Sequence, residues 1–323
     1  MQMRTLGRTG FEVSGIGHGL WGMSNWTGSD DAESRAALQH AVNLGCNFFD
    51  TAWAYGKGKS DRFVGELLRA NAGKRLYAAS KVPPKNGKWP GTAADSIEVT
   101  FPMDHVLEYC DRISEALDRK TIDLLQYHVW SDAWAKTDTF RRTVERLKSE
   151  KRIRYFGLSL NRWEPGNGIR ALRTGLVDVV QVIYNIFDQS PEDELFPVCR
   201  EMNIGVIARV PLDEGSLAGT LTRATKFPRE DWRAGYFNAQ NLAATVERVE
   251  KLRRLVPPGM SIAEMALRFI LSNPVVSTCI VGMRRISHVE ANTRAGDGAA
   301  LEASLLRELR AHRWDRRPTA WSA

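Results

Sequence analysis

Short apolar runs alternate along the chain with longer stretches in which apolar residues recur every three to four positions. The short runs are nearly continuous in apolar residues, as is typical of parallel strands covered on both faces. The longer stretches have the period of amphipathic helices. Strands are therefore predicted at residues 13–20, 47–52, 76–82, 122–129, 155–160, 177–184, 205–211 and 278–282. Helices are predicted at residues 32–44, 61–68, 104–117, 139–148, 169–173, 193–202 and 262–271.

The strict alternation of eight strands with helices predicts an α/β fold, the (β/α)8 TIM barrel. A doubly wound open sheet is the alternative, but no GxGxxG turn joins a strand to a helix, which favours the barrel. Residues 4–6 and 11–13 flank the turn 7–10 and predict an N-terminal β-hairpin that could close the bottom of the barrel. Residues 301–310 predict an added C-terminal helix. Because we find no linker and no repeat, residues 1–323 are expected to form a single domain.

Two stretches rich in turn residues, 83–102 and 212–241, follow predicted strands. The loops that follow the strands of such a barrel build its active site, and long loops in compact domains are usually functional. Both stretches are therefore candidates for walls of a substrate pocket.

The composition is that of an ordinary globular protein, with 43% hydrophobic and 26% charged residues. No apolar run reaches the roughly 18 residues of a membrane-spanning helix, and the first residues have no apolar signal core. Four cysteines lie far apart without a CxxC pair, which argues against a disulfide scaffold or a zinc site. We therefore expect a cytoplasmic protein that binds neither a membrane nor a metal.

The formal net charge of +7 suits either a phosphate-bearing small molecule or a nucleic acid as partner. The cations are spread along the chain, and their densest cluster, residues 307–317, also contains Glu308 and Asp315. Such mixed charge is typical of a solvated helix face. The sequence therefore favours a small molecule and predicts no nucleic-acid partner.

Polar residues stand at the ends of three successive predicted strands. Asp50 ends the second strand, Lys81 the third and His128 the fourth, and Tyr55 follows Asp50 by five positions. Because the carboxyl ends of parallel strands meet at one rim of a barrel, we expect the four side chains to converge. Each residue taken singly has a structural explanation. His128 could be a core histidine and Tyr55 could pack at the rim of the barrel. Asp50 could cap a turn, and Lys81 could reach solvent. Their coincidence at neighbouring strand ends favours a functional site.

These residue types can together perform acid–base chemistry. A lysine buried at a strand end needs a carboxylate partner, which Asp50 on the neighbouring strand can supply. The charge of Lys81 is expected to lower the pKa of the Tyr55 phenol by favouring the phenolate. Tyr55 could then donate a proton to a developing alkoxide, while a neutral His128 donates a hydrogen bond to the same oxygen.

Residues 45–65, GCNFFDTAWAYGKGKSDRFVG, resemble the signature of the aldo-keto reductase family. Over nearly the whole chain the order of motifs resembles that family: LGRTG, VSGIGHG, DTAWAYG, SKV, LLQYH, GLS, QVIYN, VPL and IVGMR. The most similar branch contains oligomeric bacterial and potassium-channel-β-like proteins. The resemblance implies an (α/β)8 barrel, hydride transfer from a nicotinamide to a substrate carbonyl, and a proton supplied by Tyr55. It implies a catalytic tetrad of Asp50, Tyr55, Lys81 and His128.

The resemblance also implies cofactor-binding positions. Ser159 and Gln181 match contacts to the nicotinamide carboxamide, although Leu160 stands where the family has asparagine. The segment IVGMRRISHVEAN matches the one that holds the adenosine 2′-phosphate, with Ala291 in place of a frequent glutamate. An arginine binds phosphate well through its planar fork, so Arg284 favours NADPH over NADH. The matching positions in this segment are Gly282, Met283, Arg284, His288 and Asn292.

One position departs from the family pattern. In the segment ARVPL, Arg209 stands where the family has an aromatic residue that stacks on the nicotinamide, and Leu212 ends the segment. Both residues are assigned to the cofactor. Arg209 could stack through its guanidinium, which would disfavour the cationic oxidised ring, or it could contact the pyrophosphate. The sequence leaves both interpretations open.

The chain has ten tryptophans, and several follow predicted strands on the loop side of the barrel. Aromatic walls suit an apolar or aromatic carbonyl compound or the face of a sugar. Asp132, Arg162 and Arg233 are further candidates for polar contacts to a substrate. The tryptophans assigned to the substrate pocket are Trp21, Trp53, Trp89 and Trp130.

The leading functional hypothesis is an NADPH-dependent reductase of an aldehyde or ketone, a small-molecule carbonyl substrate. The alternatives are a sugar or alcohol dehydrogenase running in the reverse direction and a slow-turnover regulatory subunit that binds NADPH. A lyase with Lys81 as a Schiff-base amine is disfavoured, because Asp50 should keep the amine protonated. The sequence leaves open whether the chain forms a homo-oligomer.

Overall fold

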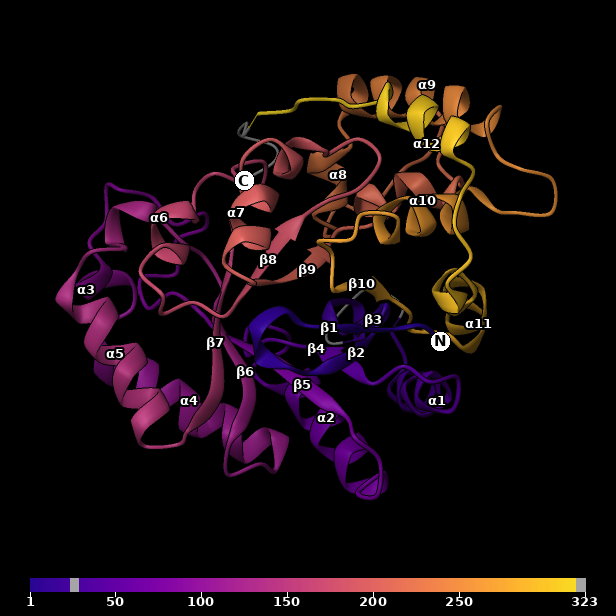
Figure 1. The fold of residues 1–323 in the computed structure, drawn as a ribbon. Coiled ribbons are helices and arrows are strands. Elements are labelled where there is room, and N and C mark those ends of the chain that lie inside the picture. Colours follow the sequence, from indigo (N-terminus) through magenta and orange to yellow (C-terminus); the bar gives the residue numbers. More distant parts are fainter. Residues whose placement is uncertain (24–28, 318–323) are drawn as a thin grey trace.

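A computed structural model describes residues 1–23 and 29–317 of the chain. Eight parallel strands close into a barrel in the order β10-β3-β4-β5-β6-β7-β8-β9, and helices surround it (Figure 1). The barrel closes where Cys279 to Gly282 of the last strand pair with Ile16 to Gly19 of the first. The predicted TIM barrel is confirmed. Its strands are β3 (Ile16–Gly19), β4 (Phe48–Asp50), β5 (Tyr77–Val82), β6 (Ile122–Tyr127), β7 (Ile153–Ser159), β8 (Val179–Ile183), β9 (Gly205–Arg209) and β10 (Thr278–Gly282).

The helices between the strands bury their apolar faces against the barrel. Helix α2 shows the pattern, since Phe63, Val64 and Leu67 are buried on one side. Gly65 on the same helix permits a close approach to α4, because a Cβ there would lie 2.5 Å from the Ala116 carbonyl oxygen. The longer helices are α1 (Asp31–Asn43), α2 (Lys59–Ala70), α4 (Met103–Leu117), α5 (Asp138–Ser149), α7 (Leu195–Glu201), α9 (Ala239–Arg253), α10 (Ile262–Leu271), α11 (Ile286–Thr293) and α12 (Ala303–Arg310). The four-residue helices are α3 (Ile97–Thr100), α6 (Ile169–Leu172) and α8 (Arg233–Tyr236).

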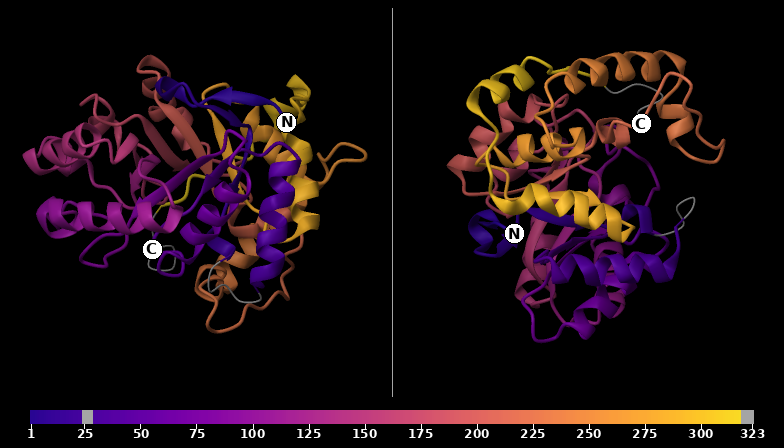
Figure 2. Two further views of the ribbon diagram at one scale, coloured as in Figure 1. Left: turned by 90° about the horizontal axis from the view of Figure 1, so that it is seen from below. Right: turned by 90° about the vertical axis from the view of Figure 1, so that its right-hand side faces the viewer.

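The predicted N-terminal hairpin is present and closes the barrel. Strand β1 (Met3–Thr5) pairs antiparallel with β2 (Glu12–Ser14). Leu6 and Phe11 of the hairpin belong to one buried apolar cluster with barrel residues such as Phe48 and Leu124. Figure 2 shows the hairpin at one end of the barrel. The hairpin therefore leaves the carboxyl ends of the barrel strands as the face available for a site.

Two boundaries differ from the prediction. The predicted strand 13–20 comprises two elements, because β2 ends at Ser14 and β3 begins at Ile16 in a different sheet. The apolar run continues across this break because both elements are buried. The stretch 212–241 is not a plain loop, since it contains a 3₁₀ segment (Asp213–Ala218), α8 and the first turn of α9. Helix α9 was not among the predicted helices.

The C-terminal part contains the predicted added helix, α12, which lies beside α9 in Figures 1 and 2. Among residues 1–23 and 29–317, no helix is long and apolar enough to cross a membrane. The same residues contain no group of three or more His, Cys, Asp or Glu side chains that could hold a metal ion. All four cysteines are buried and unbridged.

Candidate active site

The carboxyl ends of the barrel strands surround a cavity of about 820 Å³. Asp50, at the end of β4, lines it together with Tyr55 and His128. Lys81 lies behind this wall on β5 and is fully buried. Parallel strands bring all four residues to one rim, as the sequence predicted, because their carboxyl ends point the same way.

Asp50 and Lys81 form a buried ion pair beneath the cavity. Lys81 Nζ donates to Asp50 Oδ2 at 2.6 Å and to the carbonyl oxygen of Thr51 at 2.8 Å. The second carboxylate oxygen of Asp50 accepts from the side-chain amide of Gln181 at 2.7 Å. Both oxygens of the carboxylate are therefore bonded, and the ammonium is fixed in position. An isolated buried charge at either place would be costly, which explains why the pair occurs together.

Tyr55 lies over this ion pair, with its ring centre 5.3 Å from Lys81 Nζ. Burial raises the pKa of the phenol above its ordinary value, against the lowering effect of Lys81. The sequence predicted that the pKa of the phenol would be lowered, and this prediction is wrong because the pKa is raised overall. Lys81 acts as predicted, but removal of the phenolate from water outweighs it. Near neutral pH the phenol keeps its proton and is able to donate it.

His128 completes this wall of the cavity. Its ring centre lies 5.5 Å from that of Tyr55 and 4.6 Å from that of Trp89, edge-on to both. Burial, together with the charges of Lys81 and Arg209, holds its pKa well below the ordinary value. The imidazole is therefore neutral near pH 7 and carries one N–H donor.

Most of the predicted cofactor-binding residues line the same cavity. Gly282 and Met283 reach it from the end of β10, and His288 and Asn292 from α11. Ser159 is the exception, since it is buried at the end of β7 and is not among the lining residues. The residues of this set that line the cavity are Gln181, Arg209, Leu212, Gly282, Met283, Arg284, His288 and Asn292.

Arg209 stands at the end of β9 and lines the cavity. Its Nη2 donates to the carbonyl oxygen of Leu160, at the end of β7, at 2.9 Å. Its Nε is buried and has no hydrogen-bond partner in the described structure. Burial and the nearby charge of Arg162 lower the pKa of this guanidinium to about 10, so it remains charged at neutral pH. This cation with an unused donor faces the same cavity as Tyr55 and His128.

Two of the four pocket tryptophans line the cavity and two do not. Trp21 and Trp89 are on its wall. Trp53 instead packs edge-on against Tyr109 of α4, outside the barrel mouth. Trp130 is fully buried in an aromatic cluster and does not line the cavity. Their positions after strands were correct, but the direction of each side chain depends on the local turn.

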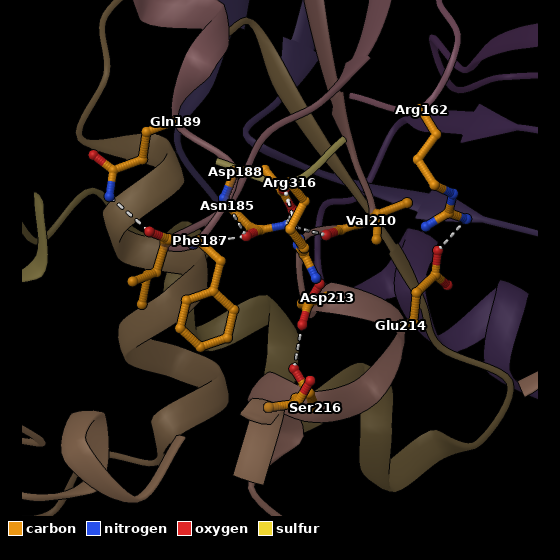
Figure 3. A network of polar contacts seen from close by, with 12 residues as sticks. Arg162, Asn185, Phe187, Asp188, Gln189, Val210, Asp213, Glu214, Ser216 and Arg316 are labelled. Carbon is orange, nitrogen blue, oxygen red and sulfur yellow. Dashed lines mark hydrogen bonds and ion pairs between the residues drawn. The ribbon is translucent and has the colours of Figure 1, made fainter. Parts of the chain in front are cut away.

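Sequence reasoning missed Trp232 and Glu214 as cavity residues. Trp232 lies 5.8 Å from Trp21, ring centre to ring centre, and both line the cavity. Glu214 accepts from Arg162 at 2.7 Å, and this pair forms part of the wall (Figure 3). Both missed residues belong to the stretch 212–241, whose length was the available signal.

Comparison with known proteins agrees with this architecture. The model of the aldo/keto reductase family matches residues 15–313. An oxidoreductase named YqkF from Bacillus subtilis is 27% identical over 97% of this chain and 96% of its own. The aldo-keto reductase yakc [NADP(+)] from Schizosaccharomyces pombe is 26% identical over 87% of this chain and 83% of its own.

The likeness extends to a channel-associated relative and to a solved structure. A probable voltage-gated potassium channel subunit beta from Oryza sativa is 26% identical, covering 92% of each chain. The holo form of aldo-keto reductase AKR11C1 from Bacillus halodurans superposes with a TM-score of 0.76 at 25% identity over 100% of both chains. With the family model matched over nearly its whole length, this chain belongs to the aldo-keto reductase family.

Proposed function

We propose that the protein is an NADPH-dependent oxidoreductase that reduces an aldehyde or ketone to an alcohol, with Tyr55 as the proton donor. The observation that carries the proposal is the wall of the cavity formed by Tyr55 and His128 above the buried Asp50–Lys81 pair. Such a wall presents a protonated phenol and a neutral imidazole to one cavity. These are the groups needed where negative charge develops on a carbonyl oxygen.

The cavity fits a dinucleotide in size and in the chemistry of its donors. Its volume of about 820 Å³ lies within the range of cofactor sites. The buried Nε of Arg209, a residue that lines the cavity, is an unused donor. Arg284 would hold an adenosine 2′-phosphate. Burial lowers the pKa of its guanidinium, and the neighbouring cations Arg285 and Arg233 add to this lowering. A 2′-phosphate beside these cations would be stabilised, which favours NADPH over NADH.

NADPH, when bound, supplies the hydride for carbonyl reduction. The chain's own residues handle the oxygen and the proton. The neutral His128 donates a hydrogen bond to the carbonyl oxygen and orients it, and Tyr55 transfers its proton to that oxygen. The phenolate left on Tyr55 is then stabilised by the positive charges of Lys81 and Arg209, both of which lower the pKa of Tyr55. Asp50 keeps Lys81 in place through its 2.6 Å contact.

The substrate side of the cavity is aromatic. Trp21, Trp89 and Trp232 line it, and they suit an apolar or aromatic carbonyl compound or the face of a sugar. The same aromatic residues would also suit an alcohol substrate that is oxidised in the reverse reaction. A Schiff-base role for Lys81 is disfavoured, because its ammonium is fully buried and bonded to Asp50 and Thr51.

A panel of aromatic aldehydes, quinones and sugars tests the proposal through NADPH consumption. Tyr55→Phe should abolish most turnover while leaving the Kd for NADPH nearly unchanged, since it removes only the hydroxyl group that donates the proton. Multiple turnovers with any carbonyl would separate an enzyme from a regulatory subunit that turns over once. Undiminished reduction by Tyr55→Phe would remove Tyr55 as donor, and failure of the wild type to bind NADPH would remove the whole assignment.

We also propose a single domain over residues 1–323, a cytoplasmic location and a small-molecule substrate as partner. The barrel with its hairpin and α12 supports the first of these. Gel filtration with light scattering would determine whether the chain forms a homo-oligomer.

A further inference from the structure

The last described residues, 311–317, run from the end of α12 back to the cavity end of the barrel. The backbone N–H of Trp314 donates to the carbonyl oxygen of Phe187 at 2.8 Å. Arg313 forms an exposed ion pair with Asp193 at 2.5 Å. The tail is thus held along the segment that follows β8.

The Arg316 guanidinium joins three separate segments of this face. It binds the Asp188 carboxylate through two nitrogens, with Nε 3.3 Å from Oδ1. Its Nη2 also lies 2.7 Å from Oδ1 of Asp213, and its Nη1 lies 3.0 Å from the hydroxyl of Tyr236. Figure 3 shows Arg316 between the two carboxylates. Asp188 belongs to the segment after β8, Asp213 to the segment after β9, and Tyr236 to α8. Arg316 therefore connects three parts of the chain.

The segment after β9 needs such a contact because its backbone is strained. Val210, Asp213 and Glu214 have φ values of 53°, 46° and 56°, in the left-handed region that side chains rarely adopt. A β-branched residue such as Val210 is especially unfavourable there. This conformation persists only if surrounding contacts maintain it.

Asp213 and Glu214 point to opposite sides of this strained turn. Asp213 does not line the cavity; it is buried, and its carboxylate is bonded to Arg316 and to the Ser216 hydroxyl at 2.6 Å. Glu214 lines the cavity and is paired with Arg162. The contact that holds Asp213 inward therefore determines where Glu214 and its partner lie.

The charges explain why Arg316 is needed. Asp188 and Asp213 are both buried and both contact the same guanidinium. Without that cation two buried carboxylates would face each other, and their repulsion would separate the segments that carry them. The turn would relax, and the cavity wall formed by Val210, Leu212, Glu214 and Gly215 would move with it.

We propose that Arg316 is a positioning residue for the ligand cavity: by binding Asp188, Asp213 and Tyr236 together, it holds the strained turn 210–215 that forms the cofactor side of the wall. The inference rests on the proposed function, because it takes the cavity as the NADPH site. Arg316 itself is not among the residues that line the cavity. Its effect passes through Asp213 to the cavity residues on the same turn.

NADPH binding, measured by protein fluorescence, tests the proposal in three purified full-length variants. Arg316→Ala should raise the Kd for NADPH by roughly tenfold or more, the size that loss of an orienting outer contact has in metal sites. Free guanidinium, which can occupy the vacated space between the carboxylates, should restore part of the affinity. Arg316→Lys retains the positive charge but cannot form the two-nitrogen contact, and it should show an intermediate Kd with a melting temperature near that of the wild type.

Arg313→Ala is the matched control. It removes two exposed ion pairs of the same tail, with Asp193 and with Asp315, and its Kd should stay within about twofold of the wild type. Wild-type affinity in both Arg316 variants would overturn the proposal. Equal loss in Arg313→Ala and Arg316→Ala would also overturn it, since the tail as a whole would then be responsible. No NADPH binding by the wild type would instead refute the proposed function.

Discussion

The charge of Arg209 destabilises the fold, and its removal should make the protein more stable. Burial lowers the pKa of its guanidinium to about 10. One pKa unit corresponds to about 1.4 kcal/mol, so the buried charge costs the folded state about 3 kcal/mol. Arg209→Met removes this cost and loses one hydrogen bond to the Leu160 carbonyl, which contributes about 1 kcal/mol. The expected net gain in the free energy of unfolding is about 2 kcal/mol.

The sign of the effect follows from proton binding. Below pH 10 the guanidinium is charged in both the folded and the unfolded states, so its cost is fully present at neutral pH. The cost disappears as pH rises above the folded-state pKa of about 10. Urea unfolding of the wild type and Arg209→Met at pH 7.5 measures the difference directly. Arg173→Met, at an exposed arginine, is the control and should change stability by less than about 0.5 kcal/mol.

A stabilising replacement implies that the charge is retained for function. If Arg209 lies near the nicotinamide, its charge disfavours NADP+ relative to NADPH, and Arg209→Met should bring the two dissociation constants closer together. If Arg209 contacts the pyrophosphate instead, Arg209→Met should weaken the binding of NADP+ and of NADPH about equally. A variant less stable than the wild type at pH 7.5 would refute the reasoning about the buried charge.

Three further predictions concern other parts of the molecule. Burial raises the pKa of the Asp61 carboxyl to about 6. Its ionisation therefore lowers the free energy of unfolding by about 3 kcal/mol above pH 6 and has no cost below about pH 4. Asp61→Asn should stabilise the protein at pH 8 but not at pH 4 in thermal unfolding. Arg284→Ala should weaken NADPH about 10–100-fold in a binding titration and leave NADH nearly unchanged, because only NADPH has the 2′-phosphate. Gly65→Ala should cost about 1–3 kcal/mol in urea unfolding, because its methyl group would lie 2.5 Å from the Ala116 carbonyl oxygen.

The barrel and the convergence of its polar strand ends could be predicted from the sequence for a physical reason. A strand buried on both faces is recorded locally as a continuous apolar run, and the alternation of such runs with helices leaves few topologies. Once the topology is a parallel barrel, Asp50, Lys81 and His128 must share one rim. The prediction of one strand at residues 13–20 failed for a local reason. Both β2 and β3 are buried, so the apolar run continues although the two strands belong to different sheets.

Side-chain directions and electrostatics could not be obtained in the same way. Trp53 and Trp89 both follow strands, but only Trp89 lines the cavity. The net direction of the Tyr55 pKa depends on how far burial outweighs Lys81, and burial is a property of the packed molecule.

The sequence by itself determined the barrel, its family and the rim where the reactive groups meet, since each depends on periodicity or on a local motif. The tertiary structure alone decided how the cavity wall is held. Arg316 contacts Asp213 and Asp188 across sequence separations of 103 and 128 residues. Chain folding creates that contact, and no local pattern of apolar and polar residues records it.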